Sequence, residues 1–242
     1  MSGALQTALV TGGARGIGAA ITARLRASGR RVIVVDILAP EPEAADLAFQ
    51  ADLSDADAAR EVFARIAAEE EVGCLVNNVG IVAPAALEDV DLADFDRLFA
   101  INLRSSLLAA QALIPGMKAR GEGRIVMNTS RVTLGKELRS LYSATKGAAQ
   151  SMARTWALEL APHGITVNSV APGPIGTEAF WANNPPDAPL TRQIVARVPV
   201  GRMGTGDDIA NAVAFFCAPE SSFVTGQTLF VCGGVTVGLA GN

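Results

Sequence analysis

The sequence predicts a single α/β domain in which a doubly wound parallel sheet of about seven strands is covered by helices on both faces. Half of its 242 residues are hydrophobic and 24 are glycine, as buried parallel strands and tight turns require. Short apolar runs alternate with longer segments of helical periodicity along the chain. No repeat, low-complexity tract or linker divides it, so we expect residues 1–242 to form one domain.

The expected strands are short runs of apolar and β-branched residues, and most are followed by an expected helix. The strands are 5–11, 31–36, 46–50, 73–78, 123–129, 165–170 and 226–231; the helices are 19–28, 55–70, 94–119, 141–160 and 206–217. The stretch between Asp36 and Asp52 is short and holds two prolines, so we expect an abbreviated or missing helix there. The proline-rich segment 178–200 is expected to be irregular and to act as a lid over substrate.

A glycine cluster, Gly12 to Gly18, joins the first expected strand to the first expected helix. Glycines at such a junction let the backbone approach a pyrophosphate, which then lies at the helix N-terminus. Asp36 ends the second strand 18 residues after Gly18, close to the separation expected for a carboxylate that binds ribose hydroxyls. The pattern favours a dinucleotide site over an ordinary tight turn.

The only tyrosine, Tyr142, stands four residues before Lys146 in a segment expected to be helical. That spacing puts both side chains on one face of the helix. A neighbouring ammonium stabilises a phenolate, so we expect Lys146 to lower the pKa of Tyr142 toward the range used in acid–base catalysis. The spacing alone also arises by chance, and it gains weight from the dinucleotide pattern.

Because it combines the glycine cluster and Asp36 with the Tyr142–Lys146 pair, the chain resembles the short-chain dehydrogenase/reductase family from Thr11 to Gly234. The resemblance implies a Rossmann-type fold over residues 1–242 and a nicotinamide dinucleotide as cofactor. Beyond the glycine turn, it implies that Asp52-Leu53 holds the adenine, that 77–80 supports the cofactor, and that 172–177 binds the nicotinamide carboxamide. The implied cofactor-binding residues are Gly12, Arg15, Gly16, Ile17, Gly18, Asp36, Asp52, Leu53, Asn78, Gly80, Tyr142, Lys146, Pro172, Gly173, Ile175 and Thr177.

The resemblance also implies four catalytic residues. Tyr142 would exchange the proton with the substrate oxygen, and Lys146 would lower the phenol's pKa and bind the nicotinamide ribose. Ser130 would hydrogen-bond the substrate oxygen, and Asn102 would position a relay water behind Lys146. Ser130 lies twelve residues before Tyr142, one fewer than is usual in the family, so Thr129 is a rival for its role.

The favoured function is an oxidoreductase that uses NAD to interconvert a secondary alcohol and a ketone. Asp36 should accept the ribose hydroxyls of NAD and repel the 2′-phosphate of NADP. Arg15 supports an alternative, an NADPH-dependent 3-oxoacyl reductase, because it could pair with that phosphate. A catalytically weak dinucleotide-binding protein with a structural or redox-sensing role is the alternative from another class.

The loop between Ser130 and Tyr142 carries three cations, Arg131, Lys136 and Arg139, against one acid. The resemblance places this loop beside the substrate, so Arg139 is a candidate to bind the carboxylate or phosphate of an acidic hydroxy or oxo compound. A solvated loop or a subunit contact is the alternative. Trp181, in the expected lid, is a second candidate substrate contact.

Several classes of partner are disfavoured. A net charge of −4 argues against nucleic acid, and the absence of a leader or membrane-spanning run leads us to expect a cytoplasmic protein. The single histidine, His163, argues against a Ser-His-Asp hydrolase. The three cysteines lack metal-site spacing, so we expect no metal and buried free thiols at Cys74, Cys217 and Cys232.

Assembly as a homotetramer is implied by the resemblance, in which the two long helices pair across a two-fold axis. These helices carry more apolar residues than one core face requires. The residues expected at that interface are Leu107, Leu108, Leu113, Met117, Ala148, Met152 and Trp156.

Overall fold

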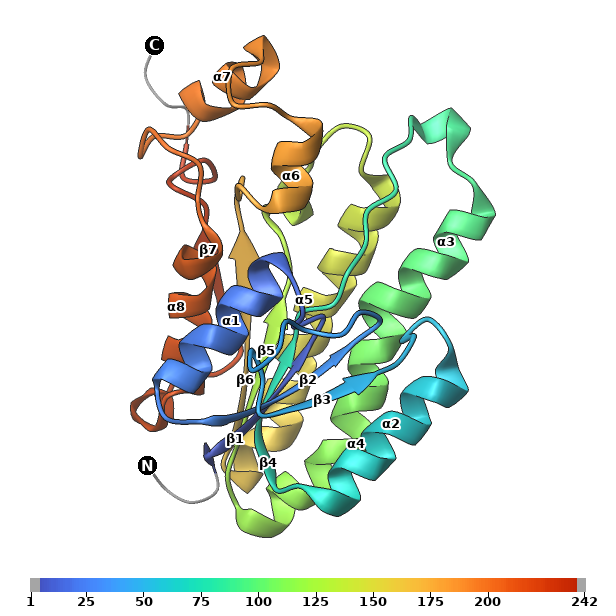
Figure 1. Ribbon diagram of the computed structural model, residues 1–242, viewed down its shortest axis with the longest axis vertical. Coiled ribbons are helices and arrows are strands. Elements are labelled where there is room, and N and C mark those ends of the chain that lie inside the picture. The colour runs from blue at the N-terminus through green and yellow to red at the C-terminus, as the bar shows by residue number, and fades with distance from the viewer. Residues whose placement is uncertain (1–4, 239–242) are drawn as a thin grey trace.

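A computed structural model describes residues 5–238 and confirms the predicted doubly wound sheet (Figure 1). Within those residues seven parallel strands are ordered β3-β2-β1-β4-β5-β6-β7. The strand order reverses between β1 and β4, because β2 and β3 follow on one side of β1 while β4 to β7 follow on the other. In such folds ligands bind at this point, in the crevice outside the carboxyl ends of the strands. The strands are β1 (Thr7–Thr11), β2 (Arg31–Asp36), β3 (Leu47–Gln50), β4 (Val72–Asn77), β5 (Gly123–Asn128), β6 (Ile165–Pro172) and β7 (Thr228–Val231).

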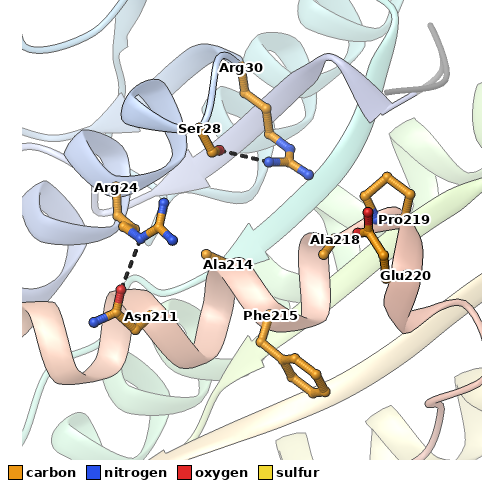
Figure 2. Close-up of a pocket in the computed structure, with 9 residues that line it drawn as sticks. All are labelled: Arg24, Ser28, Arg30, Asn211, Ala214, Phe215, Ala218, Pro219 and Glu220. Carbon is orange, nitrogen blue, oxygen red and sulfur yellow. Dashed lines mark hydrogen bonds between the residues drawn. The ribbon is translucent and has the colours of Figure 1, made fainter.

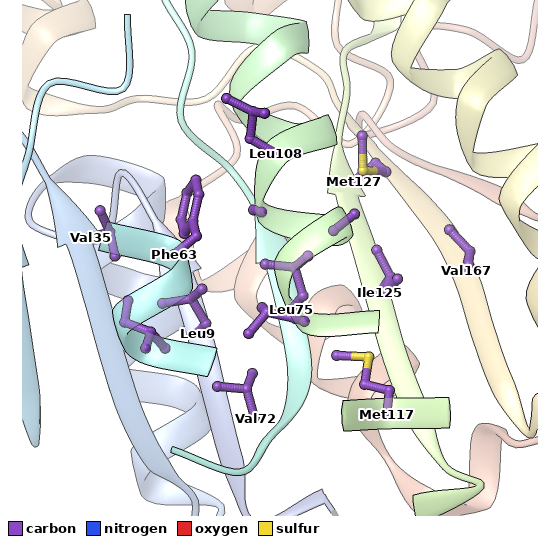
Figure 3. Packing of buried hydrophobic residues seen from close by; sticks show 14 of the residues in the cluster. Leu9, Val35, Phe63, Val72, Leu75, Leu108, Met117, Ile125, Met127 and Val167 are labelled. Carbon is purple, nitrogen blue, oxygen red and sulfur yellow. The ribbon is translucent and has the colours of Figure 1, made fainter. Parts of the chain in front are cut away.

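Helices cover both faces of this sheet because successive strand residues point to opposite sides. Leu9 packs under α2 (Ala56–Glu69), α4 (Ser105–Arg120) and α5 (Ser140–Leu160), in the cluster shown in Figure 3. Its neighbour Val10 packs under α1 (Gly16–Ala27) and α8 (Gly206–Cys217). The predicted strands and helices all occur, and each observed end lies within three residues of the predicted end.

The chain passes from β2 to β3 without a helix, as the short, proline-containing connection predicted. Asp46 fixes this connection, since its carboxylate accepts a hydrogen bond from the backbone N–H of Val32 at 2.8 Å. The same carboxylate pairs with Arg26 of α1 at 3.1 Å. The ribose end of the crevice is therefore bordered by a short turn, with no helix above it.

The predicted helix 94–119 is longer and is interrupted by a π turn. It consists of α3 (Leu92–Phe99), the π turn Ala100–Arg104 and α4. By length and composition alone the stretch Leu92–Arg120 could cross a membrane, contrary to the sequence expectation, but half of its apolar window is buried inside the fold. The helix packs on β4 and β5, so its apolar face belongs to the core.

The segment 178–200, expected to be irregular, contains two short helices, α6 (Glu178–Asn183) and α7 (Pro189–Ala196). Thr177 caps α6 by accepting a hydrogen bond from the N–H of Phe180 at 3.2 Å. Pro189 opens α7, where its missing N–H costs nothing. The prediction was wrong because these residues mark helix starts. Both helices lie beyond the carboxyl ends of the strands (Figure 1).

A shallow hollow of about 440 Å³ lies at the other end of the sheet, between α1 and α8 (Figure 2). The buried guanidinium of Arg30 donates to the carbonyl of Cys217 at 2.7 Å, and Arg124 lies beneath the carbonyls of Ala218 and Pro219. Cations at a helix C-terminus satisfy its free carbonyls and its dipole. These arginines therefore stabilise the end of α8.

Candidate active site

The glycine turn has the shape that the sequence predicted. Gly12 and Gly16 have φ of +64° and +54°, in the left-handed region that favours glycine. A Cβ on Gly18 would lie 1.8 Å from the carbonyl oxygen of Gly12, so only glycine allows α1 to start this close to β1. No side chain caps α1 at Arg15, and its first turn has no acid. The amides of Gly16, Ile17 and Gly18 thus fit a pyrophosphate.

Asp36 is held at the edge of this turn. Its carboxylate accepts hydrogen bonds from the N–H of Ala14 and the N–H of Leu38, both at 3.0 Å. The residues that follow, Ile37 and Leu38, are exposed and apolar, whereas the side chain of Arg15 is exposed on the other side of the turn. A ribose hydroxyl would meet an anion at the end of β2 and a cation within the turn.

Of the two residues predicted to hold the adenine, Asp52 and Leu53, only Asp52 has an exposed side chain. Asp52 is exposed and its carboxylate accepts a hydrogen bond from the N–H of Ser54 at 2.8 Å. Leu53 is buried, and its side chain packs in the core against β2 and α2. The side chain of Leu53 is therefore part of the core and forms no ligand surface, which corrects the sequence assignment for that side chain.

Asn78 joins the ends of three strands. Its amide nitrogen donates to the carbonyls of Thr11 and Gly12 at 3.0 and 2.9 Å, and its amide oxygen accepts from Asn128 at 2.7 Å. The glycine turn is thereby tied to β5, the strand that leads to Ser130. In the same loop, a Cβ on Gly80 would lie 3.1 Å from Nζ of Lys146, so this glycine leaves room for the buried ammonium.

Asn102 is buried in the π turn, with its side chain fully engaged. Oδ1 accepts from the N–H of Ile81 at 2.8 Å, while Nδ2 donates to the carbonyl of Ile81 and to the hydroxyl of Thr145. Thr145, a fully buried residue that sequence reasoning missed, donates in turn to the carbonyl of Tyr142 at 3.0 Å. Asn102 therefore positions the β4 loop and, through Thr145, the helix of Tyr142.

The geometry separates the two rival hydroxyls. Thr129 is buried and donates to the carbonyl of Val170 in β6 at 3.0 Å. Ser130 lies close enough to the phenol of Tyr142 to lower its pKa, and its hydroxyl also accepts from the N–H of Val132 at 3.3 Å. Ser130 is the hydroxyl that lies beside Tyr142, as the strand register from Gly123 predicted.

Lys146 is buried under the site. Its ammonium donates to the carbonyl of Asn128 at 2.8 Å and lies 5.8 Å from the centre of the Tyr142 ring. Burial lowers the pKa of Lys146 from 10.5 to about 8, because the charged form loses its hydration. A buried ammonium with one hydrogen-bond acceptor needs a further acceptor or an anion to offset the hydration it has lost at this position.

The pKa of Tyr142 departs from the expectation. Burial raises it above 10, and the hydroxyl of Ser130 and the charge of Arg139 offset this only in part. Lys146 lies below the face of the ring, but its own pKa of about 8 means that it has lost its charge before Tyr142 ionises, so the predicted lowering by lysine is not found. Arg139, just before α5, supplies the cationic effect expected of Lys146.

The turn 172–177 meets the glycine turn from the opposite side. Pro172 ends β6, and a Cβ on Gly173 would lie 2.5 Å from the Cα of Cys232. Ile175 is buried, and Thr177 lies 3.6 Å from the Cβ position of Gly16. The indole of Trp181 packs onto Gly176, with atoms 2.5–2.8 Å from its Cβ position. The predicted carboxamide turn therefore lies beside the glycine turn, with Trp181 packed on it.

The three cysteines are buried, and the only histidine lies just after the end of α5. Cys74, Cys217 and Cys232 are free and buried, as expected. His163 is exposed after α5. Within residues 5–238 no three His, Cys, Asp or Glu side chains gather in the way that a metal site needs.

Known proteins share the whole arrangement. Residues 12–236 match a family profile described as enoyl-(acyl carrier protein) reductase. The chain is 38% identical to a tropinone reductase homolog of Arabidopsis thaliana, covering 96% of this chain and 93% of that protein. It is 35% identical to sorbitol dehydrogenase of Cereibacter sphaeroides, covering 95% and 96%. A blue fluorescent protein from a metagenomic library, solved in complex with NADPH, superposes with a TM-score of 0.85 at 35% identity, covering 96% and 98%.

Proposed function

The chain belongs to the short-chain dehydrogenase/reductase family, and from this premise we propose that it interconverts a secondary alcohol and a ketone with NAD as the preferred cofactor. One observation carries the proposal. The hydroxyl of Ser130, the phenol of Tyr142 and the ammonium of Lys146 lie together at the carboxyl end of β5, where Lys146 donates to the carbonyl of Asn128. Such a group holds a carbonyl oxygen and manages one proton.

The bound nicotinamide would supply the hydride chemistry. The hydroxyl of Ser130 and the phenol of Tyr142 would bind the substrate oxygen, and Tyr142 would give its proton to that oxygen in reduction or take it in oxidation. Lys146, beside Gly80, would bind the nicotinamide ribose and gain there the additional partner that its buried charge needs. Asn102 and Thr145 would keep Tyr142 in place.

A binding and turnover assay tests this function. The protein has two tryptophans, and Trp181 packs on the turn at the nicotinamide end of the crevice. We expect NADH to quench the Trp fluorescence and the protein to turn over members of a panel of ketones and secondary alcohols. Binding without turnover of any compound would leave the structural or sensing role, and absence of nucleotide binding would contradict both readings.

Cofactor choice is the first specific prediction. We expect a higher kcat/KM with NAD than with NADP, because Asp36 repels a 2′-phosphate while Arg15 only partly offsets it. Asp36→Ser should shift the ratio of the two efficiencies toward NADP by roughly 10- to 100-fold. Asp57→Ser, at an exposed acid of α2, is the matched control and should leave the ratio unchanged. Equal efficiencies in the wild type would contradict the assignment.

A second candidate is an NADPH-dependent 3-oxoacyl reductase. It is favoured by the exposed Arg15 in the glycine turn and by the acyl-carrier description of the matching family profile. The same kinetic comparison distinguishes it, since this candidate requires NADPH preference and turnover of a 3-oxoacyl thioester.

Assembly is the second specific prediction, and the structure narrows the surface involved. Leu108, Leu113 and Met117 are buried in the core, so they are wrongly placed in the expected interface. Leu107 of α4 and the partly exposed residues Ala148, Met152 and Trp156 of α5 remain available. We propose a homotetramer, and light scattering at micromolar concentration should give four times the mass of one chain. A monomer mass would overturn the proposal.

A further inference from the structure

Three cations gather in the loop between β5 and α5, which we call the basic loop (residues 131–139). Arg131 opens a short 3₁₀ turn, Lys136 follows Gly135, and Arg139 immediately precedes α5 as its N-cap residue. Gly135 and Leu138 have φ of +103° and +56°, so the backbone reverses twice within four residues. The three side chains lie close enough together that Arg139 and Arg131 both act on the charge of Lys136.

The three cations of the basic loop form no ion pair among the described residues, and the one acid of the loop, Glu137, pairs with none of them. Seven such pairs occur elsewhere in residues 5–238. Arg139 and Arg131 both lower the pKa of Lys136, in addition to its burial, which shows that the three charges repel one another. A bound anion would remove that repulsion.

The basic loop also lies next to the reacting group. Arg139 stands three residues before Tyr142, close enough for its charge to lower the pKa of the phenol. Its guanidinium donates through Nη1 to the carbonyl of Leu138 at 2.9 Å, which leaves its other N–H groups available. The carbonyl of Leu138 also accepts a hydrogen bond from the N–H of Ala85, so the loop after β4 packs beside the basic loop next to Arg139. A merely solvated loop would not hold a half-buried arginine at this position.

Building on the proposed function, we infer that the substrate is an anionic hydroxy or oxo compound whose carboxylate or phosphate binds the basic loop, with Arg139 as its main contact. A guanidinium matches both oxyanions with two parallel hydrogen bonds, and Lys136 and Arg131 add point charges. Binding of the anion at Arg139 fixes the distance and direction of the neighbouring carbinol from Tyr142. The basic loop thereby selects the substrate by charge and orients it.

Two matched pairs of compounds test the inference, because the members of each pair share the reacting group and differ in charge. One pair is 3-hydroxybutanoate and its methyl ester, and the other is dihydroxyacetone phosphate and dihydroxyacetone. The wild type should favour the anionic member of at least one pair, which also distinguishes carboxylate from phosphate. Its KM for that member should rise with salt, and its KM for the neutral member should not.

Arg139→Ala should raise the ratio of the anionic to the neutral KM by about 10- to 100-fold, the loss expected for a charge-assisted hydrogen bond. Arg139→Lys, which keeps the charge without the planar fork, should recover part of that ratio. Arg60→Ala, at an exposed arginine of α2, is the control and should leave the ratio unchanged.

The outcomes separate this inference from the proposed function. Turnover with a neutral preference, or with equal KM values that Arg139→Ala leaves equal, overturns the inference and keeps the alcohol–ketone function. Turnover of other neutral alcohols, with none of these four compounds accepted, overturns it as well. Absence of nucleotide-dependent turnover on every compound removes the proposed function and the inference with it.

Discussion

Tyr142→Phe should lower turnover by about 10²–10⁴-fold while the affinity for the nicotinamide cofactor changes little. The substitution keeps the ring and removes the phenol that lies beside Ser130. No other tyrosine exists in the chain to replace it, and the nearest ammonium, on Lys146, donates to the carbonyl of Asn128. Steady-state kinetics in both directions and fluorescence titration with NADH measure the two quantities.

Ser130 and Thr129 provide the comparison for this experiment. Ser130→Ala should reduce kcat by roughly 10²–10³-fold, since it removes a hydrogen-bond donor to the substrate oxygen. Thr129→Ala should leave kcat near normal and lower the free energy of unfolding by about 1 kcal/mol, because its hydroxyl binds the carbonyl of Val170. Near-normal turnover in Tyr142→Phe, or a larger loss at Thr129 than at Ser130, would remove these residues from the mechanism.

Lys146→Met should abolish efficient turnover and at the same time stabilise the fold at pH 7. The pKa of Lys146 is about 8 in the folded chain and 10.5 in the unfolded one, a difference worth about 3 kcal/mol. The folded state binds the proton less tightly, so the penalty is complete below pH 8 and disappears as pH rises to 10.5. Loss of a donor to the Asn128 carbonyl offsets part of the gain, which leaves a net of about 1–2 kcal/mol.

Urea unfolding at several pH values measures this effect. The wild type should gain about 3 kcal/mol relative to Lys146→Met between pH 8 and 10.5, so that the two curves cross and the wild type is the more stable protein at the upper end. Lys118→Met, at an exposed position of α4, is the matched control and should show no such dependence. A destabilised Lys146→Met at pH 7 with a pH-independent difference would show that the buried ammonium is satisfied in the folded chain.

The features that the sequence predicted well depend on local geometry. Positive φ at Gly12 and Gly16 and the absent Cβ at Gly18 are requirements of one turn, and they appear directly as residue types. The pairing of Tyr142 with Lys146 follows from the helical repeat. The missing helix after β2 follows from the number of residues available between two adjacent strands.

The features that the sequence did not predict depend on contacts between distant segments. The pKa of Tyr142 is set by burial and by Arg139, and neither can be read from a spacing of four residues. Leu108 and Leu107 are neighbours of identical type, yet one lies in the core and the other is exposed, since successive residues of a helix point about 100° apart and only the packing of α4 decides which of them faces the sheet. Thr145 gives no signal in the sequence, because its role exists only when Asn102 lies opposite.

The π turn has a consequence for how the chain tolerates insertions and deletions. A π turn holds one more residue than the α-helical turn it replaces, and each residue of an α-helix adds a rotation of about 100°. Loss of a single residue between Ala100 and Arg104 would restore a regular α-helical turn and redirect the side chains within it, with little rotation of α3 relative to α4. Asn102 would then leave Ile81 and Thr145, even with every remaining side chain unchanged. The site thus depends on the length of this segment as strictly as on the residues within it.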